Sequence, residues 1–462
     1  MNIYGIILAA GQGKRMKSKL YKVLHPVCGQ PMVGHVTDTF AELGTARTVV
    51  IVGHGAEAVK GYLGDCAEYA LQAEQLGTGH AVMQAEAVLG EEEGITIIAC
   101  GDTPLITAET LQGMVRLMQE KQAGAVMLTA RMSNPFGYGR VIRSDDGAVQ
   151  RIVEQKDCSP EEAAVQEINA GTYCFDNRKL FAALKLVTNS NAQQEYYLTD
   201  VVGILRGQGE AVLAYSTQDT AEALGVNDRV ALAEAEQEMR ARINRKAMLG
   251  GVTIIDPQQT YIEKTVQIGP DTVLYPGTIL KGDTVIGRDC VIGPNTEVTS
   301  SQLGDGVTVK QSVLLEAVVG NEASVGPFAY LRPGANIGAY AKIGDFVEIK
   351  NATLGEGTKV SHLSYVGDAK VGSNVNIGCG AITVNYDGFR KHMTEIGDDS
   401  FIGSNVNLVA PVKIGKGAFV VAGSTITSDV GENDMAVARE RQVVKTGYAE
   451  ELRVRLKKGK SE

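Results

Sequence analysis

The stretch VQIGPDTVLYPGTILKGDTVIGRDCVIGPNTEV, residues 266–298, carries an aliphatic residue at every sixth position. Glycine often follows the aliphatic residue. A six-residue period with one buried aliphatic side chain per unit is typical of a parallel β-helix, in which about three units complete one coil. The stretch therefore predicts a solenoid. The positions with this spacing are Ile262, Ile268, Leu274, Leu280, Ile286, Ile292 and Val298.

The same spacing continues through most of the C-terminal half. It returns between Val319 and Ile349 and again between Ile396 and Ile426. Residues 384–395, VNYDGFRKHMTE, interrupt the period with a polar, basic segment that contains aromatic residues. Because long loops on a rigid scaffold commonly carry function, we expect this loop to take part in a site and to reach a neighbouring subunit.

The chain has a different character before residue 228. Short β-like runs such as RTVVIV, 47–52, and GITIIAC, 94–100, alternate with helical stretches such as 107–122. This alternation predicts an α/β domain with a mainly parallel, Rossmann-like sheet and helices on both faces. The segment 228–249 lacks Gly and Pro and predicts one exposed connecting helix. We therefore expect domains at 1–229 and 251–462, joined by a linker helix at 230–250.

Composition excludes several classes of function. The formal net charge of −10 argues against nucleic acid or an anionic membrane as the main partner. The seven cysteines are scattered without metal-ligand spacing and are typical of reduced thiols. No apolar run approaches the length of a membrane span, and no cleavable leader is evident. These observations predict a cytoplasmic protein without membrane insertion that acts on small molecules.

The stretch LAAGQGKRM, Leu8–Met16, indicates a phosphate site of an uncommon kind. It lacks the Lys-Ser/Thr ending of a Walker loop, and Met16 stands where a dinucleotide fingerprint needs its third glycine. The small residues let backbone N–H groups approach an anion, and several cations follow directly. The alternative is a glycine turn between a buried strand and a cationic surface, and the stretch alone does not decide between the two.

One histidine in the C-terminal repeat is a candidate base. His362 lies in KVSHLSYVGDAKVG, 359–372, where a small solvated residue would suffice. A lone histidine is more often structural. The cations Arg332, Lys350 and Lys391 on nearby turns and on the loop change this balance, since they suit an anionic sugar phosphate held beside a base.

The order of motifs resembles one bacterial enzyme family. The N-terminal motifs are LAAGQGKRM, KVLHPVCGQPM, QAEQLGTGHAV, GDTPL, GYGR, IVEQKD, EINAGTY, EYYLTD and GVNDR. The C-terminal motifs are RPGA, FVEIKN, SHLSYVGDA, NIGCGAITVNYDG, FIGSNVNLVAPV and VAGSTIT. Together they resemble the bifunctional uridylyltransferase/acetyltransferases that make UDP-N-acetylglucosamine. The resemblance covers nearly the whole chain and implies a left-handed β-helix in the second domain and a homotrimer.

For the first domain the resemblance implies uridylyl transfer from UTP to N-acetylglucosamine-1-phosphate. Asp102 and Asn227 would hold Mg²⁺, whose preference for oxygen ligands suits them. The residues implied in binding UTP and the sugar nucleotide are Leu8, Ala9, Ala10, Gly11, Arg15, Lys22, Gln72, Gly77, Thr78, Gly139, Glu154, Asn169 and Asn227.

For the second domain the resemblance implies acetyl transfer from acetyl-CoA to glucosamine-1-phosphate, with His362 as the general base. The implied sugar-phosphate contacts are Arg332, Lys350, Tyr365, Asn376 and Lys391. The implied acetyl-CoA contacts are Cys379, Asn385, Tyr386, Ser404, Ala422 and Arg439.

Three positions depart from the family pattern. Cys379 stands where alanine is common, Cys100 replaces an aromatic residue, and Arg439 lacks a following proline. The charged tail 450–462 is expected to be mobile at its end.

Two other functions stay open. One alternative function is a single-activity sugar-1-phosphate nucleotidyltransferase with a structural β-helix. The other is a non-catalytic regulatory subunit built from the same two domains.

Overall fold

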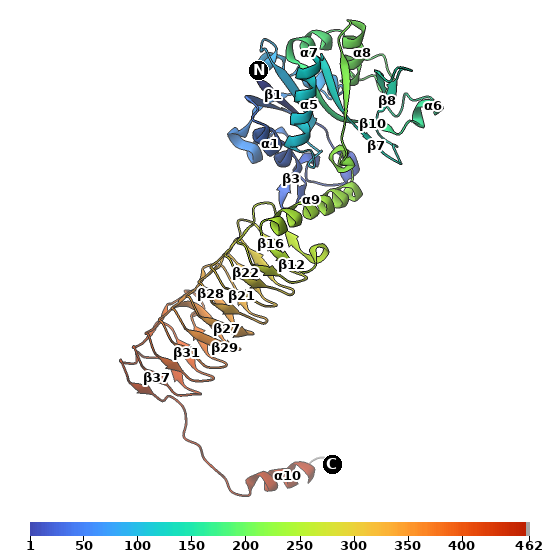
Figure 1. The fold of residues 1–462 in the computed structure, drawn as a ribbon. Coiled ribbons are helices and arrows are strands. Elements are labelled where there is room, and N and C mark those ends of the chain that lie inside the picture. Colours follow the sequence, from blue (N-terminus) through green and yellow to red (C-terminus); the bar gives the residue numbers. More distant parts are fainter. Residues whose placement is uncertain (459–462) are drawn as a thin grey trace. The chain divides into compact units, whose positions relative to one another are not determined.

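The computed structural model describes residues 1–458 and falls into two compact units. The first comprises Met1–Arg245 and Ile262–Lys264, and the second comprises Lys246–Tyr261 and the chain from Thr265 onward. Figure 1 shows the sheet and helices of the first unit and the stacked strands of the second. The expectation of a mobile end to the tail concerns residues 459–462, which lie outside the described residues.

The first unit is built on a nine-stranded, mainly parallel sheet. β1 runs parallel to β4 and β6, whereas β10 is antiparallel to both β6 and β7. The strands of the main order are β11 (Val212–Ser216), β7 (Ala125–Arg131), β10 (Glu167–Asp176), β6 (Ile95–Cys100), β1 (Ile3–Ala9), β4 (Arg47–Val52) and β5 (Glu68–Leu71). The hairpin of β8 (Arg140–Arg143) and β9 (Val149–Val153) extends from β10, and β2 (Pro26–Val27) pairs with β3 (Gln30–Pro31).

Helices cover both faces of this sheet, as the alternation of strands and helices predicts. Successive β1 residues face opposite cores, because side chains alternate along a strand: Ile6 packs in one cluster and Ile7 in the other. The first face is covered by α3 (Thr78–Met83), α4 (Glu86–Leu89), α7 (Asn177–Leu184) and α8 (Thr199–Gly207). The second is covered by α1 (Met32–Leu43), α2 (Ala56–Leu63) and α5 (Ala108–Lys121). The short helix α6 (Pro160–Ala163) contributes to neither cluster.

The helix expected over 228–249 is present as α9 (Arg229–Leu249). Asp228 begins it as an N-cap, since its Oδ1 accepts the N–H groups of Val230 and Ala231 at 3.0 Å. Only Ala235 and Asn244 of α9 are buried, and its other residues are half-buried or exposed. None of the described helices is long and apolar enough to cross a membrane.

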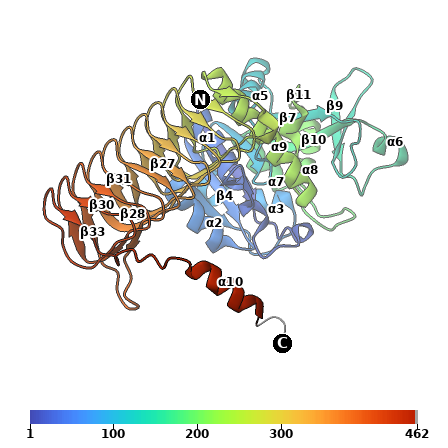
Figure 2. The same cartoon turned by 90° about the horizontal axis from the view of Figure 1, so that it is seen from below.

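The second unit is a left-handed parallel β-helix, as the six-residue period and the resemblance predict. Val273 pairs in parallel register with Val291, three six-residue units further on. Figure 2 shows the successive coils stacked side by side. The repeated aliphatic residues are buried, with Leu274, Leu280 and Ile292 at 0% exposure, and Ile268 is the half-buried exception.

The strands of the β-helix form two sheets, and the second sheet contains two parallel ladders that are joined by the long strands β28 and β30. The first contains β12 (Thr253–Ile254), β15 (Val273–Leu274), β18 (Val291–Ile292), β21 (Thr308–Val309), β24 (Ser324–Val325), β27 (Lys342–Asp345), β29 (Lys359–His362), β31 (Asn376–Ile377), β34 (Phe401–Ile402), β37 (Phe419–Val420) and β39 (Met435–Ala436). The second begins with β13 (Tyr261–Ile262), β14 (Gln267–Ile268), β16 (Ile279–Lys281), β17 (Val285–Ile286), β19 (Glu297–Thr299), β20 (Gln302–Leu303), β22 (Val313–Leu315), β23 (Val318–Val319) and β25 (Tyr330–Leu331). It continues with β26 (Ala335–Ile337), β28 (Glu348–Leu354), β30 (Tyr365–Val371), β32 (Ile382–Val384), β33 (Thr394–Ile396), β35 (Asn407–Val409), β36 (Val412–Ile414) and β38 (Thr425–Ile426).

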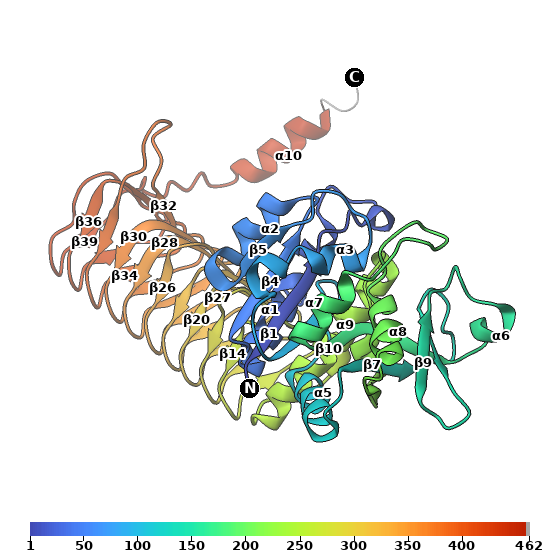
Figure 3. The same ribbon diagram turned by 90° about the horizontal axis from the view of Figure 1, so that it is seen from above.

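The interruption at 384–395 is a loop between β32 and β33, and Figure 3 shows a loop projecting from the coils beside β32. Tyr386 and Lys391 form an antiparallel bridge across the loop, and Phe389 near its tip is 92% exposed. After the loop the chain rejoins the coils in register, since Ala369 of β30 pairs with Thr394 of β33. The described chain ends in α10 (Tyr448–Lys458).

Candidate functional site

The first candidate site lies at the carboxyl ends of β1 and β6. These strands are adjacent and parallel, and the N–H of Gly101 donates to the carbonyl of Leu8 at 2.9 Å. Glycine is required at Gly13, where φ is 64° and a Cβ would lie 2.4 Å from the Cβ of Lys22. A Cβ at Gly11 would meet nothing within 4 Å, so the turn at that residue faces open space. The loop therefore leaves its backbone accessible to a ligand.

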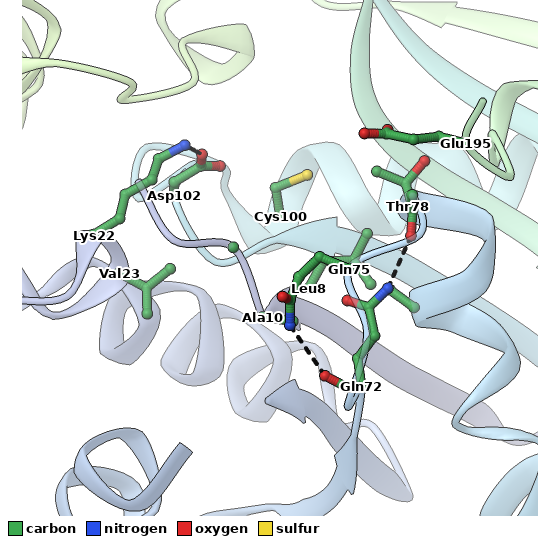
Figure 4. Close-up of a pocket in the computed structure, with 13 residues that line it drawn as sticks. Leu8, Ala10, Lys22, Val23, Gln72, Gln75, Thr78, Cys100, Asp102 and Glu195 are labelled. Carbon is green, nitrogen blue, oxygen red and sulfur yellow. Dashed lines mark hydrogen bonds and ion pairs between the residues drawn. The ribbon is translucent and has the colours of Figure 1, made fainter. Parts of the chain in front are cut away.

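A cavity of about 260 Å³ opens beside this loop (Figure 4). Of the residues expected to bind nucleotide, it is lined by Leu8, Ala10, Gly11, Lys22, Gln72, Gly77 and Thr78, and the expected metal ligand Asp102 lines it as well. Gln75, Cys100 and Glu195 also line it. Ala9 does not, because its side chain belongs to the core on one face of the sheet. The cavity is therefore lined by residues of five sequence motifs: LAAGQGKRM, KVLHPVCGQPM, QAEQLGTGHAV, GDTPL and EYYLTD.

Lys22 and Asp102 of the cavity lining meet two expected site residues, Arg15 and Asn227, that do not line the cavity. The Nζ of Lys22 forms an ion pair with the carboxylate of Asp102 and donates to Oδ1 of Asn227 at 2.7 Å. Arg15 donates to the same Oδ1 at 2.8 Å. The Asp102 and Asn227 segments are joined directly, since the N–H of Val226 donates to the Asp102 carbonyl at 2.9 Å. A carboxylate oxygen and an amide oxygen therefore converge on one positive charge.

Another part of the cavity is shaped by Gln72, Gly77 and Thr78. The amide of Gln72 donates to the carbonyl of Gly77 at 3.0 Å, and its side chain is buried. Gly77 has φ 109°, and a Cβ there would lie 2.6 Å from the carbonyl oxygen of Tyr196. The hydroxyl of Thr78 accepts the N–H of Leu198 at 3.1 Å. These bonds tie the segment before α3 to the segment before α8 and fix the cavity wall.

The three residues expected to contact the sugar lie together but do not line this cavity. The N–H of Asn169 donates to the carbonyl of Gly139 at 2.9 Å, and a Cβ on Gly139 would lie 3.5 Å from Oε1 of Glu154. Burial raises the pKa of Glu154, with the neighbouring carboxylates of Asp157 and Asp200 acting in the same direction. Glu154 lines a separate space with these two carboxylates. The structure therefore places this trio outside the wall of the first cavity.

Cys100 occupies the first cavity but is not a reactive thiol. Burial raises the pKa of Cys100 to about 12, and the negative charge of Asp102 contributes. Because the thiolate is the nucleophilic form, this cysteine stays protonated and unreactive near neutral pH. It forms a small apolar part of the cavity wall.

The second candidate site is centred on His362, the last residue of β29. Its side chain is 58% exposed, and its Nδ1 lies 2.5 Å from Oδ1 of Asp345. The two residues are register partners on adjacent coils, β27 and β29. The sequence did not single out Asp345, although the coil length places a residue 17 positions earlier beside His362.

Positive charge gathers on the coils next to His362. Arg332 forms an ion pair with Glu348 at 2.7 Å, and Glu348 is the register partner of Tyr365. A hydrogen bond and the like charge of Lys391 lower the pKa of Lys350, and the charge of Arg332 adds to this effect. The negative charge of Asp368 acts in the opposite direction on the pKa of Lys350 and so partly offsets the repulsion. The three cations expected at the sugar-phosphate site are therefore brought together.

A buried carboxylate organises the floor of this site. Asp368 is 7% exposed and accepts the amides of Asn351 at 2.6 Å and Asn385 at 2.5 Å. The amide of Asn385 also lies 3.4 Å from the hydroxyl of Tyr365. Asn385 of the expected acetyl-CoA set thus links Asp368 to Tyr365 of the expected sugar-phosphate set. Sequence reasoning missed it because burial of a carboxylate cannot be seen in a six-residue repeat of aliphatic positions.

The remaining acetyl-CoA candidates form a column along successive coils. The Cys379 carbonyl accepts the N–H of Asn405, and the Ser404 carbonyl accepts the N–H of Gly423, which follows Ala422. A Cβ on Gly423 would lie 3.6 Å from Cδ of Arg439. Cys379, Ser404, Ala422 and Arg439 are therefore aligned in that order. Asn376 lies apart from this column on β31, paired with Lys359 and Phe401.

The projecting loop carries Tyr386 and Lys391 and has its own stabilising pair. His392 Nε2 lies 2.7 Å from Oδ2 of Asp387, whose Oδ1 accepts the N–H groups of Phe389 and Arg390. The hydrogen bond to His392 lowers the pKa of Asp387 to about 2. Asp387 therefore fixes the turn at the loop tip. Tyr386, from the expected acetyl-CoA set, is 58% exposed on this loop.

Comparison with known proteins identifies relatives for both units. Residues 4–228 match the nucleotidyl transferase family, and residues 265–300 and 393–428 match the bacterial transferase hexapeptide repeat. A protein of Geobacillus sp. (strain WCH70) named "Bifunctional protein GlmU" is 58% identical over 452 residues, which cover 98% of this chain and 98% of the relative. The protein of the same name from Bacillus subtilis (strain 168) is 57% identical over 449 residues, covering 97% of this chain and 98% of the relative. The likeness thus spans both units.

Proposed function

The chain belongs to the family of bifunctional GlmU proteins, and from that premise we propose how its residues divide two transfer reactions. The chain is a bifunctional enzyme. Its β-helix transfers an acetyl group from acetyl-CoA to glucosamine-1-phosphate, and its first unit transfers a uridylyl group from UTP to N-acetylglucosamine-1-phosphate with release of pyrophosphate. The supporting observation is that each unit holds its own cluster of chemically suitable side chains.

In uridylyl transfer a phosphate oxygen of the sugar attacks the α-phosphorus of UTP, and the bond to the pyrophosphate oxygen breaks. Negative charge spreads over phosphate oxygens in the transition state, so cations and backbone N–H groups supply most of the catalysis. We assign Lys22 and Arg15 to the triphosphate and the open backbone around Gly11 to a phosphate oxygen. Gln72, Gly77 and Thr78 bind the uracil, and Gly139, Glu154 and Asn169 bind the acetylated sugar.

A divalent metal serves nucleotidyltransferases of this family, and we assign Mg²⁺ to Asp102 and Asn227. These residues fit a hard cation, because their oxygens already converge on the positive charge of Lys22. Within residues 1–458 no group of three or more His, Cys, Asp or Glu side chains forms a metal site. The two protein ligands therefore suit a metal that is also held by substrate phosphates. When bound, the metal neutralises charge on the transferred phosphate.

In acetyl transfer we assign the base to Nε2 of His362. As the amine nitrogen of glucosamine-1-phosphate attacks the thioester carbon, Nε2 takes the proton from that nitrogen. The C–S bond then breaks, and the proton passes to the leaving thiolate of coenzyme A. Arg332, Lys350 and Lys391 hold the sugar phosphate with Tyr365 and Asn376. A backbone N–H or the hydroxyl of Ser404 stabilises the tetrahedral oxyanion.

We extend the assignment to assembly and location. A triangular solenoid presents flat sides that can pack around a threefold axis, and the projecting loop 384–395 would then reach a neighbour's site. We therefore propose a homotrimer whose acetyl-CoA contacts include Tyr386. We also propose that the protein works in the cytoplasm, where both of its nucleotide substrates are available.

Each alternative function fails to account for one of the clusters. A nucleotidyltransferase with a purely structural β-helix would not need His362 beside Lys350, Lys391 and Arg332. A non-catalytic regulatory subunit would not need Asp102 and Asn227 to converge on Lys22 beside a cavity. Both alternatives leave one of these clusters of charged and polar side chains without a purpose.

The His362→Ala variant tests the assignment of the acetyl-transfer site. It is expected to lower the acetyl-transfer rate by roughly 10²–10⁴-fold, the usual contribution of a positioned base. Uridylyl transfer in the same sample serves as the control for folding and is expected to be unchanged. A folded His362→Ala protein that acetylates glucosamine-1-phosphate at nearly the normal rate would show that the base lies elsewhere.

A further inference from the structure

Asp345 and His362 form a pair that lies outside the substrate contacts assigned above. The carboxylate oxygen lies 2.5 Å from Nδ1 of the imidazole. An ionised carboxylate only accepts hydrogen bonds, so Nδ1 carries the proton and donates it. In the neutral ring the other nitrogen, Nε2, then keeps its lone pair. The contact therefore selects the one tautomer in which Nε2 acts as a base.

The backbone holds Asp345 firmly in the position that makes this contact. Asp345 ends β27 and pairs with His362 across the ladder, and its carbonyl accepts the N–H of Leu363 at 2.9 Å. The next residue, Phe346, has φ 55° and stacks on Phe328 with ring centroids 5.3 Å apart. The turn after Asp345 is thus anchored to the preceding coil. The hydrogen bond from His362 is the largest cause that lowers the pKa of Asp345, which keeps the carboxylate ionised near neutral pH.

The second histidine–aspartate pair of the β-helix shows what a structural pair looks like. Asp387 accepts two backbone N–H groups in addition to His392, and it engages Nε2 of that ring. Asp387 therefore stabilises a turn, whereas Asp345 contacts the ring through Nδ1 and leaves Nε2 for a reactant. Both side chains of the Asp345–His362 pair are at least one-third exposed, so the pair adds little to folding stability.

We propose that Asp345 is a positioning residue for acetyl transfer, which fixes the tautomer and orientation of His362 and stabilises the imidazolium that forms. The inference rests on the proposed role of His362 as the base. As the new N–C bond forms, Nε2 accepts the amine proton and the ring becomes positive while Asp345 keeps its negative charge. The proton then moves from Nε2 to the thiolate as the C–S bond breaks, which restores the neutral ring.

The Asp345→Asn variant tests this role with little change of shape. An amide placed at Nδ1 can donate, which favours the tautomer with its proton on Nε2 and removes the base. We expect kcat for acetyl transfer to fall roughly 10²-fold, within the range that a positioned base and its orienting carboxylate contribute. The KM values for glucosamine-1-phosphate and acetyl-CoA are expected to stay within about twofold, since the assigned binding residues are untouched. Asp283→Asn, which removes an exposed carboxylate from an earlier coil, is the matched control.

Two further variants separate this inference from the function on which it rests. The double variant Asp345→Asn/His362→Ala is expected to be no slower than His362→Ala alone, because both changes remove the same base. If His362→Ala is inactive while Asp345→Asn turns over normally, the positioning role is refuted and the base assignment survives. If His362→Ala itself is active, the proposed site is wrong. The rate of acetyl transfer by Asp345→Asn could instead fall because the KM values rise, or fall together with uridylyl transfer. Either result would assign Asp345 a merely structural role.

Discussion

Replacing Asp102 by Asn tests the chemistry of the nucleotide cavity by removing one charge at nearly constant shape. The Asp102 side chain is 17% exposed and faces the Lys22 ammonium, which is 14% exposed, so neither charge is well screened by water. Loss of one preorganised electrostatic contact in such a site typically costs about 2.7–4 kcal/mol of transition-state stabilisation. We therefore expect kcat for uridylyl transfer to fall roughly 10²–10³-fold.

Release of pyrophosphate from UTP and N-acetylglucosamine-1-phosphate, followed across a Mg²⁺ titration, is the assay for this variant. Asp65→Asn is the matched control, since Asp65 is an exposed carboxylate of the same unit. Acetyl transfer in the same sample is expected to stay normal, because its assigned residues lie in the other unit. Asp102→Asn protein that releases pyrophosphate at the control rate at every Mg²⁺ concentration would refute the reasoning. Equal loss of both activities would refute the separation of the two sites.

Three other predictions concern metal, pH and the repeat. Removing divalent metal with a chelator should stop pyrophosphate release and spare acetyl transfer; release that survives thorough chelation would exclude the metal role. Burial lowers the pKa of His35 from about 6.5 to about 4, so stability is complete above pH 6.5 and falls as pH decreases toward 4. Urea unfolding should show a loss of about 2 kcal/mol between pH 7 and pH 5, smaller in His35→Gln. Leu280→Ala, at a fully buried position, should destabilise the β-helix by about 2–5 kcal/mol, and Val285→Ala, at a 40% exposed position, by less than about 1 kcal/mol in the same denaturation experiment.

The architecture could be predicted from the sequence because its signals are local and periodic. The six-residue spacing at Leu274, Leu280 and Ile286 directly reports which side chain each unit buries. The apolar runs that become β1 and β6 likewise mark buried strands, and the structure pairs these two strands in parallel. These features depend on near neighbours, so a pattern in the chain is sufficient to reveal them.

The site was only partly visible in the sequence, because much of it depends on distant contacts. Motif spacing drew attention to His362 but not to Asp345, whose role depends on the exact number of residues in a coil. It also missed Asp368, since a buried carboxylate bonded to two amides looks like any surface aspartate in the printed chain. The convergence of Asp102 and Asn227 on Lys22 joins segments 205 residues apart, which no local pattern reports.

The coupled reaction tests the central claim most directly. The full-length wild-type protein is supplied with glucosamine-1-phosphate, acetyl-CoA, UTP and Mg²⁺, and products are separated and identified. The account predicts free coenzyme A, pyrophosphate and UDP-N-acetylglucosamine, with the sugar nucleotide absent when acetyl-CoA is withheld. Formation of UDP-N-acetylglucosamine only when N-acetylglucosamine-1-phosphate is supplied from outside, with no coenzyme A released from glucosamine-1-phosphate, would contradict it.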